Sequence, residues 1–372
     1  MTFNFYFILI ALILLVSIAF GVGLYFWTTS GTGQPIFKSI VERARDYEKL
    51  RKYRGKPYFD SSSTIFVSIA SYRDPECAFT VKRLLEHAVY PERVFIGILQ
   101  QNKIDKDHDC TELLHDKELA QVRVKTVDAK KARGPLYARS VIIDELFNNE
   151  QYYLQIDSHT YPVIGWDVLA LQQLDASPSE NPVLTCYPDD YDMYNADAPK
   201  SKTRWLMRFM RWNEAGIPEF ENTYCPEHVC KSNVPTPCLF YAAGFCFASS
   251  EILQVLKPLK EISKDVFFGE EVLVALVLFT HGWDLFTPSK PLIYHLWNRD
   301  YRPTFWEHQN SKRIEKGKTN VDKILQILQG KTKGQSNNYL GQSKTLKEFE
   351  THCGIDFTRK TVDEKAKKGY FE

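Results

Sequence analysis

The residues best suited to chemistry are one carboxylate and two imidazoles. The apolar run Tyr152–Ile156 (YYLQI) is followed by Asp157, Ser158 and His159. Side chains two positions apart on a strand point the same way, so Asp157 and His159 share one side. Taken alone, this pair also fits an aspartate that caps a turn beside an incidental histidine. A later apolar run, Leu292–His295 (LIYH), supplies a second histidine. One carboxylate and two imidazoles suit a Mn²⁺ or Mg²⁺ ion that bridges two phosphates.

Two acids open a strongly apolar helix further along the chain. Glu270 and Glu271 follow Phe267-Phe268-Gly269, and the glycine allows the backbone to approach a ligand closely. Acids in a first helical turn also stabilise the helix dipole. The pair is therefore either catalytic or helix-stabilising.

A third motif, Ala132–Arg139 (ARGPLYAR), places Arg139 one turn into a helix. Its guanidinium is suited to a diphosphate, although a surface salt bridge is equally consistent with the spacing. No P-loop and no GxGxxG fingerprint accompanies these residues, so neither a kinase nor a dinucleotide enzyme is indicated. The remaining hypothesis is a site for a metal-held nucleotide sugar.

The elements that must position these residues alternate along the chain. Strands are expected at Thr64–Ala70, Arg93–Gln100, Val122–Val127 and Tyr152–Ile156, with helices between them. This order predicts an α/β fold with a mostly parallel central sheet flanked by helices. Ligands of such sheets collect beyond the carboxyl ends of the strands, which here carry Ser71-Tyr72-Arg73-Asp74 and Asp157-Ser158-His159.

Composition excludes some partners. The 372 residues include 47 Lys and Arg against 46 Asp and Glu, which gives a net charge of +1. Without an excess of cations the chain is not expected to bind nucleic acid through bulk charge. Hydrophobic residues make up 44% and charged residues 25%, as in an ordinary globular protein.

The two ends suggest a membrane-anchored enzyme. The run from Phe3 to Trp27 carries no charge and is long enough to cross about 30 Å of hydrocarbon, whereas a signal peptide has a basic start and a shorter apolar core. We expect a transmembrane anchor that binds the lipid bilayer over residues 1–28, a stem over 29–61, the catalytic domain over 62–358 and a charged tail over 359–372.

The segment Tyr191–Lys231 lacks periodicity and is expected to form loops and short helices that shape an acceptor cleft.

The sequence leaves both sides of the membrane open for the catalytic domain. Basic residues follow the apolar run closely and favour a cytoplasmic catalytic domain. Anchored transferases, by contrast, commonly face the lumen of the Golgi or the endoplasmic reticulum. The cysteines at 225, 230, 238 and 246 are compatible with disulfides in a lumen or with free thiols in a cytosol.

Several segments resemble one known family. FVSIASYRDPEC, GPLYAR, YYLQIDSHTYPVIGWD, AAGFCFASSEIL, FFGEE and IYHLW occur in the order seen in a GT-A glycosyltransferase family whose members attach N-acetylglucosamine (GlcNAc) in α linkage to protein hydroxyls. The resemblance covers about residues 62 to 358 and implies a GT-A fold. The metal pattern, Asp-x-His plus a distant His, is also similar to that of the polypeptide N-acetylgalactosaminyltransferases.

The resemblance implies roles for particular residues. Asp157, His159 and His295 would hold Mn²⁺ on the diphosphate of a UDP-sugar, and Glu270 would hydrogen-bond the donor sugar. Contacts to the nucleotide would come from Ser71, Tyr72, Arg73, Asp74 and Arg139. The reaction would retain the anomeric configuration, with Glu270, Glu271 and Arg139 as the catalytic candidates. A carboxylate beneath the anomeric carbon would be that of Asp265, Glu270 or Glu271.

The leading hypothesis is therefore a UDP-GlcNAc-dependent transferase that acts on a protein hydroxyl. One alternative keeps the fold but uses another nucleotide-sugar donor or a glycan acceptor, because donor choice depends on a few pocket contacts. A second alternative is an inactive transferase fold that serves as a carbohydrate-binding membrane protein.

Overall fold

The computed structural model describes residues 63–190, 204–230, 233–305, 307, 311–331 and 339–371. The chain divides into two units, 1–54 and 55–372, and every described residue belongs to the second. The anchor and stem expected over residues 1–61 lie outside the described residues. Within the described part, none of the helices combines the length and the apolar character that a membrane crossing requires.

An eight-stranded sheet forms the centre of the domain, in the order β10-β12-β6-β11-β4-β1-β2-β3. The four strands β3, β2, β1 and β4 are parallel, as are β6 and β12, while β11 runs antiparallel to both of its neighbours. The predicted mostly parallel sheet is thus confirmed. The strands are β1 (Ile65–Tyr72), β2 (Val94–Asn102), β3 (Val122–Asp128), β4 (Tyr152–Asp157), β6 (Pro182–Thr185), β10 (Thr236–Pro237), β11 (Phe245–Ser249) and β12 (Asp284–Thr287).

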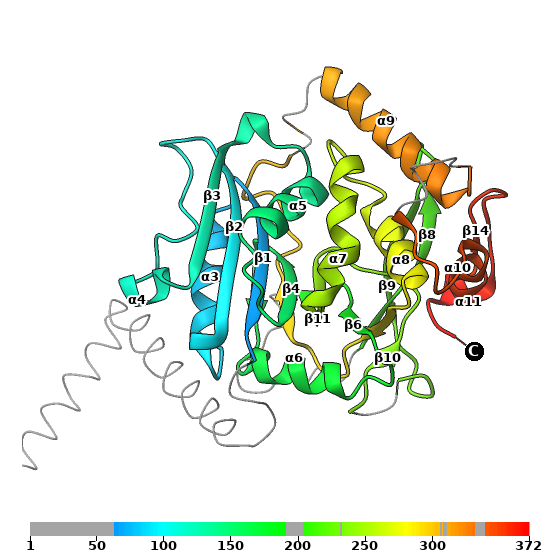
Figure 1. The fold of residues 1–372 in the computed structure, drawn as a ribbon, viewed down its shortest axis with the longest axis horizontal. Helices are drawn as coiled ribbons and strands as arrows, with labels where there is room; N and C mark the ends of the chain where they lie inside the picture. Colours follow the sequence, from blue (N-terminus) through cyan, green and yellow to red (C-terminus); the bar gives the residue numbers. More distant parts are fainter. Residues whose placement is uncertain are drawn as a thin grey trace, which may run out of the picture. The chain divides into compact units, whose positions relative to one another are not determined.

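Helices cover both faces of this sheet (Figure 1). Alternate residues of β1 point to opposite faces, so Val67 and Ile69 join one core and Phe66 joins the other. The core of Val67 and Ile69 is closed by α3 (Glu76–Glu86) and α6 (Trp166–Asp175). The core of Phe66 is closed by α5 (Pro135–Glu145), α7 (Leu253–Leu256) and α8 (Glu270–Thr280). The result is a three-layer α/β/α domain.

Smaller elements complete the domain. A three-stranded sheet has the order β5-β13-β7 and is built from β5 (Thr160–Pro162), β13 (Ile293–His295) and β7 (Asp189–Asp190). The remaining helical segments are η1 (Pro91–Arg93), α4 (Asp116–Leu119), η2 (Ala129–Lys131), η4 (Ser250–Ile252), η5 (Lys257–Ile262), α9 (Ser311–Leu328), α10 (Leu346–Cys353) and α11 (Glu364–Lys368).

Two expectations about irregular segments need correction. Within the segment 191–231, expected to form loops and short helices, the described residues include a hairpin of β8 (Trp205–Trp212) and β9 (Pro218–Tyr224). The expected charged tail is folded, because its residues form β15 (Thr361–Val362), which pairs with β14 (Ile355–Asp356), and α11. Ala366 of α11 is fully buried in the same core as the apolar residues of α8, so this segment is part of the domain.

The cysteines form two pairs. Cys77 of α3 is bonded to Cys110 in the loop after β2, and both are buried. Cys225 is bonded to Cys230 just after β9. Of the four clustered cysteines in the sequence, two are therefore paired, whereas Cys238 and Cys246 are free buried thiols.

Candidate active site

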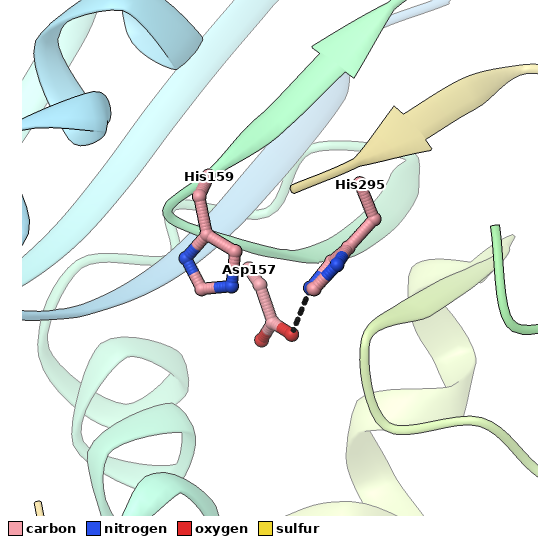
Figure 2. A group of neighbouring side chains, drawn as sticks. All are labelled: Asp157, His159 and His295. Carbon is pink, nitrogen blue, oxygen red and sulfur yellow. Dashed lines mark hydrogen bonds and ion pairs between the residues drawn. The ribbon is translucent and has the colours of Figure 1, made fainter. Parts of the chain in front are cut away.

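The structure brings the three predicted metal ligands together (Figure 2). Asp157 ends β4, His159 follows in the turn to β5, and His295 ends β13. Pairing of β13 with β5 sets His295 opposite Thr160, which places the two imidazole centroids 4.5 Å apart. Nε2 of His295 lies 3.2 Å from Oδ2 of Asp157, and one ligand atom from each residue lies within 4.8 Å of the others. A single divalent ion fits between such donors.

The turn that carries His159 is fixed from α3. The hydroxyl of Thr80 lies 2.9 Å from the carbonyl oxygen of Ser158 and accepts a hydrogen bond from the backbone N–H of Thr160. All of these groups are buried. The position of the imidazole is therefore set by the same helix that packs against β5.

Asp74, one of the residues expected to contact the nucleotide, is bound to His159. Its Oδ2 lies 2.7 Å from Nδ1 of His159 and accepts a hydrogen bond from Ser158, while its Oδ1 accepts one from the hydroxyl of Tyr301. Burial alone raises the pKa of Asp74, but the hydrogen bond from His159 and the charge of Arg302 hold it below its ordinary value. With Nδ1 engaged in this way, Nε2 of His159 is the atom available to a metal.

The neighbouring residues, Ser71 and Tyr72 at the end of β1 and Arg73 after it, differ in their surroundings. Tyr72 lines the central cavity and meets Phe305 edge to face, with centroids 5.9 Å apart. Ser71 is fully buried, and Arg73 turns away through a left-handed backbone (φ 51°) to bind Asp107 at 2.7 Å. Of the four expected nucleotide contacts, Tyr72 is the one that lines the cavity.

The guanidinium of Arg139 donates hydrogen bonds to two carboxylates. One terminal nitrogen donates to Oδ1 of Asp157 at 2.8 Å and the other to Oε1 of Glu270 at 2.6 Å. Burial lowers the pKa of this guanidinium, but the two carboxylates outweigh that effect and raise it. The sequence allowed a diphosphate contact or a surface salt bridge. The structure instead has a buried bridge between the metal group and the start of α8.

The two acids of α8 differ in their surroundings. Gly269 has a φ of 104° and begins the helix in a left-handed conformation. Burial raises the pKa of Glu270 in spite of its ion pair with Arg139. Glu271 accepts hydrogen bonds from the hydroxyl of Tyr187 at 2.6 Å and from the backbone N–H of Ala243 at 3.1 Å. Burial nevertheless raises the pKa of Glu271 to about 7, a value that suits acid–base chemistry near neutral pH.

Asp265, the third candidate carboxylate, is held by Arg133. Nε of Arg133 donates to Oδ1 at 2.8 Å, a terminal nitrogen donates to Oδ2, and the backbone N–H of Asp265 binds the carbonyl oxygen of Arg133 at 2.6 Å. Both Asp265 oxygens are thus engaged.

The metal group, Arg139 and the three candidate acids Asp265, Glu270 and Glu271 border one cavity of about 770 Å³. The metal group, Tyr72 and Arg139 line one part of it. Other walls come from residues on separate elements: Tyr187, Met210, Asn213, Pro218, Glu219, Phe220, Phe268, Trp297, Arg302, Lys318 and Val321. Of these, Arg302, Lys318 and Val321 lie in no motif or segment that the sequence singles out.

One family of known proteins matches the chain. A family model described as Glycosyltransferase (GlcNAc) matches residues 64–119 and 111–359, which is most of the chain. No curated protein sequence gives a match.

Three solved structures illustrate the likeness in backbone. The first is GalNAc-T7 with UDP, GalNAc and Mn²⁺, at a TM-score of 0.47 and 13% identity, covering 77% of this chain and 54% of that one. The second is S. aureus TarS in complex with UDP-GlcNAc, at 0.44 and 12%, covering 74% and 69%. The third is the mannosyltransferase PcManGT from Pyrobaculum calidifontis in complex with GDP-Man and Mn²⁺, at 0.39 and 10%, covering 82% and 88%. The chain spans about half the length of the GalNAc-T7 chain.

Proposed function

The chain belongs to the glycosyltransferase (GlcNAc) family, and on this premise we propose that it transfers GlcNAc from UDP-GlcNAc to a protein hydroxyl with retention of the anomeric configuration. The observation that supports this most directly is the convergence of Asp157, His159 and His295 beside the Arg139–Glu270 pair, at the wall of a cavity of about 770 Å³.

The donor set fits Mn²⁺. Imidazole is a borderline donor and carboxylate a hard one, a combination that Mn²⁺ accepts, and Asp157 is ionised because His295 and Arg139 outweigh its burial and lower its pKa. Asp74 orients one of the imidazoles, as carboxylates do at many metal sites. When bound, the ion would supply positive charge that stabilises the departing UDP.

The protein's own groups have distinct tasks in this proposal. Arg139 holds Asp157 and Glu270 in a fixed relation, so the metal side and the acidic side of the cavity are built as one unit. Glu270 faces the donor-sugar hydroxyls, and Glu271 is held by Tyr187 at the cavity wall. Tyr72 contacts the nucleotide.

The test is release of UDP from UDP-GlcNAc by the full-length protein in detergent, with Mn²⁺ and with a chelator. We expect release that stops with chelator and in His295→Ala, but continues in His281→Ala, whose imidazole lies 2.8 Å from the backbone oxygen of Val277 in α8 and is not part of the metal group. Release in the presence of chelator would contradict the metal-dependent proposal. Preference for UDP-Glc or UDP-GalNAc would keep the glycosyltransferase fold but change the donor that we propose.

The acceptor is tested separately. Peptides that carry Ser, Thr or hydroxyproline are compared with free glycans, and we expect sugar transfer to the peptides. Transfer only to glycans would favour the glycan-acceptor alternative. Binding of the donor without release or transfer would favour the inactive carbohydrate-binding alternative.

We also propose that the catalytic domain faces an oxidising lumen of the endomembrane system, held there by the N-terminal anchor expected from the sequence. The pairs Cys77–Cys110 and Cys225–Cys230 support this, because disulfides persist in oxidising compartments and are rare in the cytosol. A protease-protection assay on intact microsomes tests it. A digested catalytic domain would place it on the cytoplasmic side, as the basic flank suggests.

A further inference from the structure

The β8–β9 hairpin forms a wall of the catalytic cavity. Its residues that line the cavity are Met210, Asn213, Ala215, Pro218, Glu219 and Phe220. The turn is closed by Asn213, whose side-chain oxygen accepts from the N–H of Ile217 at 3.0 Å. Ile217 is fully buried, and a Cβ on Gly269 would lie 3.6 Å from its Cδ1. The hairpin therefore packs against the residue that begins α8 and precedes Glu270.

Within the part of the chain that the structure describes, this hairpin has no third strand beside it. A two-stranded hairpin is only marginally stable by itself and needs packing against another element. One attachment lies at its base, where the hydroxyl of Thr287 donates to the carbonyl oxygen of Trp205 at 2.8 Å. The rest of the hairpin must be supported elsewhere.

Residues 355–371 supply that support at two separate points. Near the base, Gly369 follows α11 with a φ of 86°, and a Cβ there would lie 2.5 Å from the carbonyl oxygen of Met207 and 3.0 Å from Cγ2 of Thr223. At the turn, the amine of Lys360 lies against Gly216. Figure 1 shows α11 and β14 on the same side of the domain as β8 and β9, away from β1–β3.

We infer that residues 355–371 are a positioning element for the acceptor, and that Gly369 is the close contact through which they hold the β8–β9 hairpin. The acceptor part rests on the proposed function. The metal ligands come from β4, the following turn and β13, and the expected nucleotide contact, Tyr72, comes from β1. The hairpin contributes none of these residues, so the part of the cavity wall that it forms is available to bind the acceptor.

The test compares Gly369→Ala with Gly282→Ala. Gly282 has nearly the same backbone conformation (φ 83°), but a Cβ there meets only the side chain of Ser343 at ordinary contact distances of 3.4–3.5 Å. Both substitutions therefore carry a similar conformational strain, and only Gly369→Ala forces a side-chain atom into β8. Gly369→Asn is a third variant, because Asn tolerates a positive φ while its Cβ still meets Met207.

Two measurements are made on the full-length protein. Amide hydrogen exchange over residues 205–224 is expected to become about tenfold faster in Gly369→Ala and Gly369→Asn, but not in Gly282→Ala. With UDP-GlcNAc, Mn²⁺ and a mixture of Ser, Thr and hydroxyproline peptides, the acceptor KM is expected to rise about tenfold while acceptor-independent UDP release stays within about twofold.

Unchanged exchange in the hairpin and an unchanged acceptor KM would overturn the inference. So would a uniform loss of protection across the whole domain in both Gly369 variants, because the segment would then support the fold in general. If the wild type releases no UDP, the proposed function fails, and the exchange of residues 205–224 still decides whether Gly369 holds the hairpin.

Discussion

Oδ2 of Asp74 lies 2.7 Å from Nδ1 of His159, although 85 residues separate them in the sequence. Parallel pairing of β1 with β4 produces this relation, since it sets Ala70 beside Asp157 and so brings the ends of both strands to the same edge. Asp74 also accepts a hydrogen bond from the backbone N–H of Glu76 at the start of α3. The carboxylate is fixed before any metal binds.

We therefore expect Asp74→Asn to lower Mn²⁺ affinity by about 10–100-fold, as loss of a carboxylate behind a metal-bound histidine typically does. The affinity is measured by titrating Mn²⁺ and following the free ion by electron paramagnetic resonance. Asp107→Asn is the control, because it removes the same charge from the partner of the neighbouring Arg73. Equal affinities in the two variants would show that Asp74 does not orient His159.

Arg139 is expected to be essential for stability as well as for the site. Arg139→Ala leaves Glu270 as an uncompensated buried carboxylate and removes one of the partners of Asp157, which costs about 3–5 kcal/mol in the free energy of unfolding. Chemical denaturation measures this loss. Arg208→Ala, which removes an exposed ion pair with Glu221, should cost less than about 1 kcal/mol.

A double-mutant cycle gives a second check on the bridge. Glu270→Gln removes one of the two charges that Arg139 binds, so its effect on unfolding should not add to that of Arg139→Ala. Additive losses would indicate that the two side chains act independently.

Part of the site could be predicted because it depends on strand ends. A buried strand that stops at Asp157 and a later one that stops at His295 are visible as apolar runs, and the parallel strands β1 and β4 deliver their carboxyl ends to one edge. For the same reason the alternation of strands and helices predicted the central sheet. These features follow from local pattern and need no knowledge of distant contacts.

The partnerships within the site could not be predicted in this way. Arg139 lies 131 residues from Glu270 in the sequence, and no spacing rule indicates that the guanidinium of Arg139 binds buried carboxylates. The hairpin was missed because its strands are irregular: β8 has mixed burial along its length and a register shift between Phe209 and Arg211. Residues 359–371 look like a solvated tail because only Ala366 and Gly369 are buried among many charges.

Glu271 should make stability depend on pH. Its folded pKa of about 7 lies above the ordinary value of 4.5, so folding favours the protonated form. The contribution is fully present below about pH 4.5 and is lost as the pH rises through about 7, by up to about 3 kcal/mol. Unfolding by denaturant between pH 4 and pH 8 measures it.

The comparison that isolates this group is Glu271→Gln, in which the decline in stability between about pH 4.5 and 7 should be smaller than in the wild type. Glu221→Gln, on the exposed ion pair of the hairpin, should keep the wild-type pH profile. An identical decline in wild type and Glu271→Gln would assign the dependence to other groups.

The disulfides should differ in their contribution to stability, because a cross-link restricts the unfolded chain more when it closes a longer loop. Cys77 and Cys110 are 33 residues apart, and their replacement by Ala should cost about 3–4 kcal/mol. Cys225 and Cys230 are 5 residues apart, and the same change should cost about 2 kcal/mol.

Denaturant unfolding without reductant measures both losses, and Cys186→Ala, which removes a free thiol, controls for the substitution. Cys77–Cys110 also ties α3 to the loop that holds Asp107 against Arg73, so its loss should raise hydrogen exchange there. If reductant leaves the stability of the wild type unchanged, neither bond contributes. The proposal of an oxidising lumen would then lose its support, whereas the assignment of the metal group would stand, because it depends on different residues.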